Sequence, residues 1–427
     1  MLNFIIIVSL LLITLFLGLP VAFSLGVTAT ILIFAFDLPV NIIGQTIYSS
    51  LDSFVLLSIP LFVMMSQILL VGKVGDDLFN VMNTWVRHLP GGLAIATILS
   101  CAFFAAITGS SAATAATIGM VAIPALIERG YERRFTLGLL AAGGTLGILI
   151  PPSIPMILYG AITEESVGKL FIAGIIPGII LTLIFITYAV YKSTKGGAYC
   201  AVEAASWKER WEITSKNMWG IALPFIIIGG IYTGIFTPTE AAGVGLGYSL
   251  FICLFIYKTL KLKDFKKIFL KSVETSCMIA LIIAGAILFG QVMTYLEIPQ
   301  VLTNIVIEKH FSPLMFIVAM NILMLFLGCI LETVSIILLT MPLVIPILHL
   351  LHIDPIWYAV IVVINMEMAL ITPPVGINLY VINGIDSDSN MADIIKGVWP
   401  FMLLMVFMLI LIIAFPPLST WLPSVMK

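Results

Sequence analysis

The fold of this chain is decided by one stretch, GGTLGILIPPSIP at residues 143–155. It lies within an apolar segment, yet a regular helix cannot continue through it. Each of its three glycines costs a helix about 1 kcal/mol relative to alanine, and the adjacent Pro151 and Pro152 remove backbone donors and clash with the preceding turn. Because an interrupted helix is tolerated at membrane depth only where it is buried in protein or lines a cavity, the stretch predicts a broken helix in one of these two settings.

A second interruption follows in the other half of the chain. The sequence TPPVGIN at residues 372–378 lies in another apolar segment, and Pro373 comes 222 positions after Pro151. Interruptions at corresponding positions of two repeats point to the binding site of a secondary transporter. Three further proline pairs recur at offsets of 222 or 223, namely Pro90 with Pro313, Pro124 with Pro346 and Pro177 with Pro400.

The composition is that of a membrane protein. The 427 residues are 61% hydrophobic and 10% charged, with a mean hydropathy of +1.18, whereas soluble domains are about 25% charged. At about 20 residues per crossing, the chain has room for about ten to twelve crossings. The net charge of −2 implies that the chain has no nucleic-acid partner. The five cysteines and four histidines lack the spacing of metal ligands, so we expect no transition-metal site.

We predict an all-α polytopic fold made of two inverted-topology repeats, residues 1–191 and 217–427, joined by a cytoplasmic connector at 192–216. Each repeat is expected to contain five transmembrane helices, one of them broken, and one re-entrant helical hairpin. An odd number of crossings in each repeat makes the two repeats inverted. The hairpins are predicted at 91–127 and 313–349, the broken helices at 135–160 and 357–383, and polar or basic connectors at 37–52 and 258–271.

Lysine and arginine set the expected orientation, because they gather on the cytoplasmic side of membrane proteins. Placing residues 192–216 in the cytoplasm puts 17 of the 20 Lys and Arg on that side. Both termini then face the periplasm. The tips of the two hairpins, at 110–111 and 328–333, are expected to meet close to the middle of the bilayer.

The tip of the first hairpin carries hydroxyl groups. Ser110, Thr114 and Thr117 share one helix face, and Ser111 turns beside them among alanines that let backbones pack closely. Hydroxyls and carbonyls at such a tip can bind a cation or a carboxylate. The alternative interpretation is the ordinary packing of a helix rich in small residues.

Acidic and amide side chains lie at the second tip and the second interruption. Glu332 follows Ser110 by 222 positions, and an ionisable group at this depth is costly unless it is paired or hydrated. Glu332 is therefore a candidate for binding the coupling ion or a proton, or else it is held by hydrogen bonds of its own hairpin. Glu367 carries the same two interpretations, and Asn378 either orients a polar ligand or caps the resumed helix.

The positive charges of the chain lie away from the predicted site. Every Lys and Arg falls in a predicted loop or at the end of a segment. An anionic substrate would therefore be neutralised by the positive ends of half-helices aimed at the centre, together with hydroxyls and bound sodium.

Four strings resemble the large membrane (M) subunit of tripartite ATP-independent periplasmic (TRAP) transporters: TGSSAAT at 108–114, GILIPPS at 147–153, GIFTPTEA at 234–241 and PPVGIN at 373–378. The resemblance implies an elevator-type transporter in a bacterial inner membrane that takes up an organic acid with sodium as coupling ion. It also implies two partners, a periplasmic substrate-binding protein and a small four-helix membrane subunit, and a transport role rather than an enzymatic one.

The resemblance also assigns residues to two sodium sites and one substrate site between the tips. The first sodium site would use Ser110, Ser111, Gly144, Gly147 and Ile150, and the second Gly328, Glu332, Thr333, Ala369 and Thr372. The substrate would contact Ser111, Thr114, Thr145, Pro151, Pro152, Ser153, Thr333, Pro373, Pro374 and Asn378. Sialic acid is the favoured substrate, with C4-dicarboxylates as the closest variant.

Two other classes of function remain as alternatives. One is a stand-alone sodium- or proton-coupled dicarboxylate carrier, which uptake with and without a binding protein would distinguish. The other is an intramembrane enzyme. That enzyme would need clustered Asp or His near the membrane interface, and the sequence lacks such a cluster.

Overall fold

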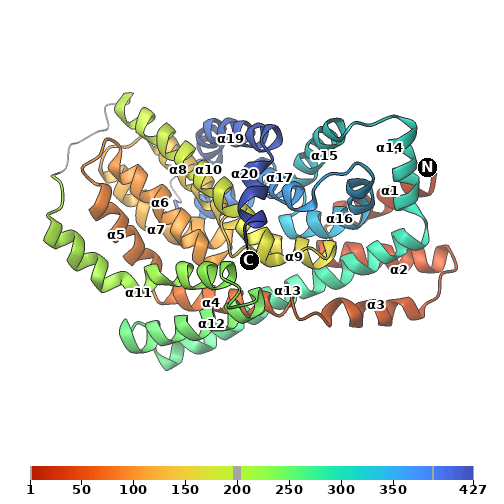
Figure 1. Ribbon diagram of the computed structural model, residues 1–427, viewed down its shortest axis with the longest axis horizontal. Coiled ribbons are helices and arrows are strands. Elements are labelled where there is room, and N and C mark those ends of the chain that lie inside the picture. Colours follow the sequence, from red (N-terminus) through yellow and green to blue (C-terminus); the bar gives the residue numbers. More distant parts are fainter. Residues whose placement is uncertain (1, 196–202, 387–388, 427) are drawn as a thin grey trace.

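The computed structural model describes residues 2–195, 203–386 and 389–426, and every regular element in these ranges is a helix. The first part of the chain forms α1 (Leu2–Phe16), α2 (Val21–Ala35), α3 (Asn41–Leu51), α4 (Ser58–Val71), α5 (Val74–Val86), α6 (Gly92–Thr108), α7 (Ser111–Glu128), α8 (Arg133–Leu149), α9 (Ile154–Thr163) and α10 (Val167–Lys195). Figure 1 shows these elements in red to yellow.

The second part of the chain follows a similar order. It forms α11 (Trp207–Tyr232), α12 (Pro238–Phe251) with a π-helical continuation η1 (Ile252–Ile256), α13 (Leu262–Tyr295), α14 (Ile298–Glu308), α15 (Pro313–Gly328), α16 (Thr333–Leu350), α17 (Pro355–Ala369), α18 (Ile377–Ile385), α19 (Met391–Ala414) and α20 (Pro417–Ser424). Within the described residues, seven helices are long and apolar enough to cross a membrane, or eight if α4 and α5, bent by 67° at their junction, count as one.

Both double-proline sites interrupt a helix. The helix α8 ends at Leu149 and α9 begins at Ile154, while α17 ends at Ala369 and α18 begins at Ile377. The Pro151–Pro152 and Pro373–Pro374 peptide bonds are both cis. At the first interruption the Ser153 hydroxyl donates to the Ile148 carbonyl at 2.5 Å, which satisfies one of the carbonyls that the break releases.

The first hairpin, α6 and α7, turns at Gly109. This glycine has φ of 61°, a left-handed conformation that side chains disfavour. The Pro152 carbonyl occupies the space that a Cβ on Gly109 would need, so glycine is required there for a second reason. Ser110 then starts α7, its hydroxyl accepting from the Ala113 N–H at 3.4 Å. The turn thus holds the first hairpin tip against the first interruption.

The broken helix α8 lies at the centre of the molecule. It packs against α6, α7 and α19, and every residue from Phe135 to Leu149 is buried. Two glycines bring α8 and α19 together, because a Cβ on Gly138 would overlap the carbonyl of Gly397. Close packing of this kind is typical of small residues between membrane helices.

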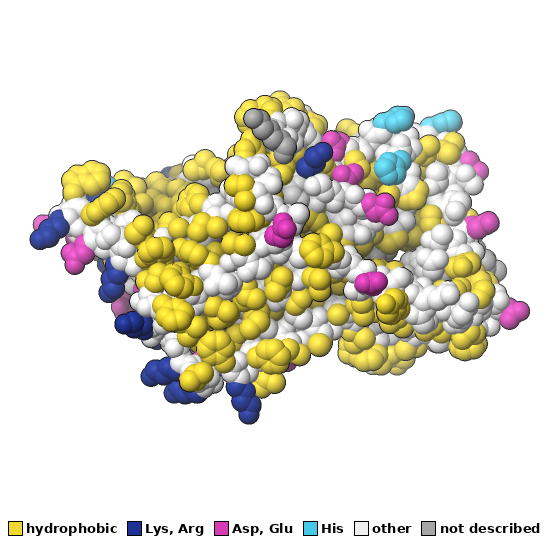
Figure 2. Space-filling model, turned by 60° about the horizontal axis from the view of Figure 1, so that its bottom comes forward, with side chains coloured by type: hydrophobic (Ala, Val, Ile, Leu, Met, Phe, Trp, Pro, Cys, Tyr) yellow, Lys and Arg dark blue, Asp and Glu magenta, His cyan; other side chains and the backbone are white. Residues whose placement is uncertain are grey.

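The long helix α13 contacts elements from both parts of the chain. Figure 1 shows it crossing the lower part of the molecule from α12 to α14, and it packs on α2, α3 and α4 as well as on α16. The face of the molecule seen in Figure 2 is largely hydrophobic, with Lys and Arg gathered along one edge. This distribution is expected of a protein whose sides contact lipid and whose basic edge lies at the membrane surface.

Three predicted connectors are helical in large part. Residues 41–51 form α3, α13 already begins at Leu262, and α11 begins at Trp207 within the predicted 192–216 connector, of which 196–202 lie outside the described residues. The sequence of 262–271 is polar but rich in good helix formers. Its start is capped by Asp264, whose carboxylate accepts from the Lys261 N–H at 2.9 Å. A prediction from apolarity alone therefore starts α11 and α13 too late in the chain.

Candidate functional site

The two hairpin tips line one cavity of about 160 Å³. The first hairpin contributes Gly109, Ser110, Ser111 and Ala112, the second Glu332, Thr333 and Val334, and the two interrupted helices Ile148, Ile154, Pro155, Leu370 and Ile377. The helix α13 closes one side with Thr275, Met278 and Ile279. Residues more than 200 positions apart thus share one small space, which we call the tip cavity.

Asn378 joins the first hairpin to the second interrupted helix. Its Nδ2 donates to the Ser111 hydroxyl at 2.8 Å and to the Ala141 carbonyl at 2.9 Å. The residue before α18 is Gly376, which makes no side-chain capping bond, so capping is not the role of Asn378. Because Asn378 and Ser111 are both buried, their contact fixes the position of the tip relative to α18.

Backbone approaches bring the first tip close to α8. A Cβ on Gly147 would lie 2.7 Å from the Ser110 carbonyl oxygen, and one on Gly144 would lie 2.6 Å from the Cβ of Ala115. The backbone carbonyl of Ser110 therefore meets α8 directly. The side chain of Ile150 points elsewhere, contacting the position of Gly178, so only its backbone could serve a site here.

The second tip meets α17 in the same way. The Cβ of Ala369 occupies the space beside Gly328, and the Thr372 hydroxyl donates to the Met368 carbonyl at 2.6 Å. Glu332 precedes α16 but its side chain makes no capping bond. Among the described residues that line the tip cavity, Glu332 is the only charged one. Carboxylate, hydroxyl and carbonyl oxygens are the ligands that hard cations prefer.

Several predicted substrate residues do not line the tip cavity. The hydroxyls of Thr114 and Thr145 donate to the carbonyls of Ser110 and Ala142, and both side chains are fully buried. Ser153 is also fully buried, and its hydroxyl donates to the Ile148 carbonyl within the first interruption. The four prolines of the two interruptions, Thr372 and Asn378 also lie outside its lining.

Two polar residues of α17 are buried outside the tip cavity, Asn365, which was not assigned from the sequence, and Glu367, which was a candidate for the ion or a proton. Asn365 Nδ2 donates to the backbone and side-chain oxygens of Asn321 on α15, both at 2.9 Å. The sequence signal that could have predicted this contact is the presence of single asparagines, Asn321 and Asn365, within apolar helices. Glu367 is fully buried and neither of its oxygens has a hydrogen-bond partner among the described residues. It lies about 200° around the helix from Ala369, away from the face that meets the second tip.

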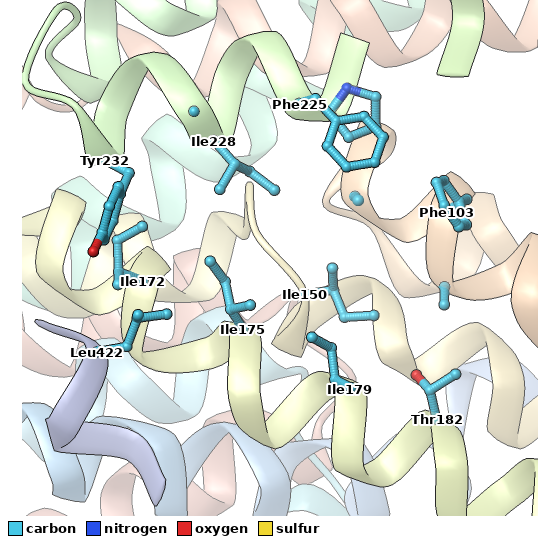
Figure 3. Close-up of a pocket in the computed structure, with 14 residues that line it drawn as sticks. Phe103, Ile150, Ile172, Ile175, Ile179, Thr182, Phe225, Ile228, Tyr232 and Leu422 are labelled. Carbon is cyan, nitrogen blue, oxygen red and sulfur yellow. The ribbon is translucent and has the colours of Figure 1, made fainter. Parts of the chain in front are cut away.

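A larger cavity, of about 650 Å³, lies between α6, α10, α11 and α20. Figure 3 shows its aliphatic and aromatic lining, with Phe103, Phe225 and Ile150 pointing into it. Thr182 and Tyr232 carry the hydroxyls of this lining, and no charged side chain is among the described residues there. A polar organic acid would lose its hydration without compensation in such a groove, so we place the site at the tip cavity.

Known proteins give an independent view of the chain. The curated C4-dicarboxylate TRAP transporter large permease protein DctM of Pseudomonas aeruginosa is 41% identical over 405 residues, which is 94% of each chain. The sialic acid TRAP transporter large permease protein SiaM of Vibrio cholerae is 32% identical over 411 residues, 96% of each chain. Among solved structures, the Alcanivorax borkumensis YdaH transporter aligns with a TM-score of 0.57 over 90% of this chain and 86% of that one, at 13% identity.

The structural likeness supports the fold alone, while the sequence likeness covers the whole permease. The family described as "Tripartite ATP-independent periplasmic transporter, DctM component" matches residues 7–418, which include both hairpins and both interrupted helices. The chain belongs to this family of TRAP transporter large permeases.

Proposed function

We propose that this chain carries a C4-dicarboxylate across the inner membrane together with sodium. Two permeases named for C4-dicarboxylates are 36% and 41% identical to this chain, against 32% and 33% for two permeases named for sialic acid. This comparison favours C4-dicarboxylates over the sialic acid expected from the sequence. Sialic acid remains the second candidate, because its permeases match over nearly the same length.

One observation carries the proposal of a coupling cation. The tip cavity joins the two hairpins and the two interrupted helices, and its charged lining residue, among those described, is a carboxylate. An anionic substrate placed beside Glu332 would be repelled, because like charges at short range raise the energy of both. A bound sodium ion removes this repulsion, so substrate and ion would bind together.

Large permeases of this family work with a periplasmic substrate-binding protein and a small membrane subunit. We propose the same partners here, with the lysine-rich edge at the cytoplasm and both termini in the periplasm. The binding protein would deliver substrate to the outer face. The hairpins and interrupted helices would then move as one body against α13 and its neighbours, as in an elevator.

The test is uptake of radiolabelled succinate into proteoliposomes that contain this permease and its small subunit. We expect uptake to require the binding protein and an inward sodium gradient. An inward proton gradient in sodium-free buffer should not replace it. Sialic acid, with its own binding protein, is the comparison substrate. Uptake that ignores sodium, or that proceeds at full rate without any binding protein, would contradict the proposal.

A further inference from the structure

A second cavity, of about 450 Å³, lies where α13 faces α9 and α16. Unlike the apolar groove of Figure 3, it has a polar lining: Ser49, Ser50, Ser53, Glu164, Gln291 and Thr294. In the proposed orientation it opens toward the periplasm, because the end of α9 and the end of α13 lie on that side. We call it the outer cavity.

The charge of the outer cavity favours a cation. Glu164 is the charged member of the described lining, which includes no Lys or Arg. The hydroxyls of Ser50 and Thr294 donate to carbonyls of their own helices, so their oxygens present lone pairs to the cavity. A concave surface of one sign of charge raises the local concentration of counter-ions and repels ions of its own sign. The outer cavity would therefore repel an organic anion.

The outer cavity and the tip cavity share two helices. On α13, Ile283 lines the outer cavity and Ile279, one turn away, lines the tip cavity. On α16, Leu338 and Val334 have the same relation. One turn of a helix rises about 5.4 Å. The two cavities are therefore separated by a single apolar layer, to which the buried Leu158 of α9 also belongs.

We propose that the outer cavity is a sodium vestibule, in which Glu164 and the surrounding oxygens concentrate hydrated sodium ahead of the tip cavity. The inference rests on the proposed sodium coupling. It assigns Glu164 a role in recruiting the ion, distinct from the residues that hold it between the tips. Movement of the hairpins relative to α13 would remove the apolar layer and let the ion pass.

The neighbouring acidic residue provides a matched control. Glu165 follows Glu164 in the chain but does not line the outer cavity. The test measures succinate uptake against external sodium in right-side-out vesicles, with the binding protein added outside, for Glu164→Gln and Glu165→Gln. We expect Glu164→Gln to raise the sodium concentration for half-maximal uptake about threefold at low ionic strength. The difference in half-maximal sodium concentration between Glu164→Gln and wild type should fade as choline chloride is added, because salt screens exposed charges. At saturating sodium the two uptake rates should be equal.

Further variants separate recruitment from folding. Glu164 has φ of 59° at the end of α9, a conformation that asparagine tolerates well, so Glu164→Asn should fold and behave like Glu164→Gln. Glu164→Asp should restore the wild-type value, and Glu164→Lys should raise it further.

The outcomes distinguish this proposal from the function on which it rests. Wild-type uptake that does not respond to sodium would overturn both. Sodium-dependent uptake with the same half-maximal concentration in wild type and Glu164→Gln would overturn the vestibule alone. An equal rise in Glu165→Gln would show a general structural effect and would also reject the vestibule.

Discussion

Replacing Asn378 with alanine should separate the first hairpin tip from the second interrupted helix. The change removes two contacts: the one with the Ser111 hydroxyl, which lies 2.8 Å from Nδ2 and 3.0 Å from Oδ1, and the 2.9 Å bond from Nδ2 to the Ala141 carbonyl. A buried hydrogen bond contributes about 1 kcal/mol net, so we expect a loss of about 2 kcal/mol. If this loss falls on the ion-binding conformation, the sodium concentration for half-maximal uptake rises about 30-fold, since 1.4 kcal/mol corresponds to a factor of ten.

The assay is a double-mutant cycle on sodium-activated uptake, with Ser111→Ala, Asn378→Ala and the double variant. The two side chains share one contact, in which the Ser111 hydroxyl lies 2.8 Å from Asn378 Nδ2 and 3.0 Å from Asn378 Oδ1, and this contact should not be lost twice. The double variant should therefore be about fivefold less impaired than the product of the two single effects, which equals a coupling of about 1 kcal/mol. Asn383→Ala is the control, because Asn383 lies on the same helix and its amide oxygen accepts from Ser389 instead.

Asn383→Ala should change the half-maximal sodium concentration less than twofold and should combine independently with Ser111→Ala. If the effects of Ser111→Ala and Asn378→Ala multiply in the double variant, the contact does not transmit ion binding. The role of Asn378 in positioning the tip would then be wrong, even if each single variant is impaired.

Three other changes test the packing and the charge of the site. Gly138→Ala should lower the thermal unfolding temperature of the purified protein, because the new Cβ would overlap the Gly397 carbonyl. Overpacking of this kind costs about 1–3 kcal/mol. The control Gly243→Ala, whose new Cβ would meet open space, should leave this temperature unchanged. Gly147→Ala should abolish sodium-dependent uptake while the protein still reaches the membrane, since its Cβ would displace the first tip. Glu332→Gln should weaken sodium activation at least tenfold, and an unchanged activation curve would remove Glu332 from the ion site.

The two interruptions could be predicted from the sequence because their cause is local. Two adjacent prolines break a helix whatever surrounds them, and both predicted breaks appear where Pro151 and Pro373 stand. The helix ends of α11 and α13 could not be placed in this way. Polar residues such as those of 262–271 are compatible with a helix or a loop, and the choice depends on a cap at Asp264 rather than on apolarity.

The site itself was predictable in outline only. Hydroxyl and acidic residues at equal positions of two repeats indicated which tips would face each other, because the repeat constrains both. The bond between Asn378 and Ser111 joins residues 267 positions apart, and nothing in the local sequence of either specifies the other. The same is true of the outer cavity, whose lining comes from five separate helices and loops.

The charge of the tip cavity gives a physical reason for coupling an ion to an anion. Two unit charges of the same sign about 5 Å apart repel by about 3 kcal/mol at an effective dielectric constant of about 20, and a dicarboxylate brings two such charges toward Glu332. The described lining supplies no Lys or Arg to oppose them. With the proposed sodium coupling, such a site would bind its substrate weakly when sodium is low and tightly when sodium is high. Exchanging Glu332 for a lysine should therefore do more than weaken transport: it should let substrate bind without sodium, and so separate binding from the gradient that drives uptake.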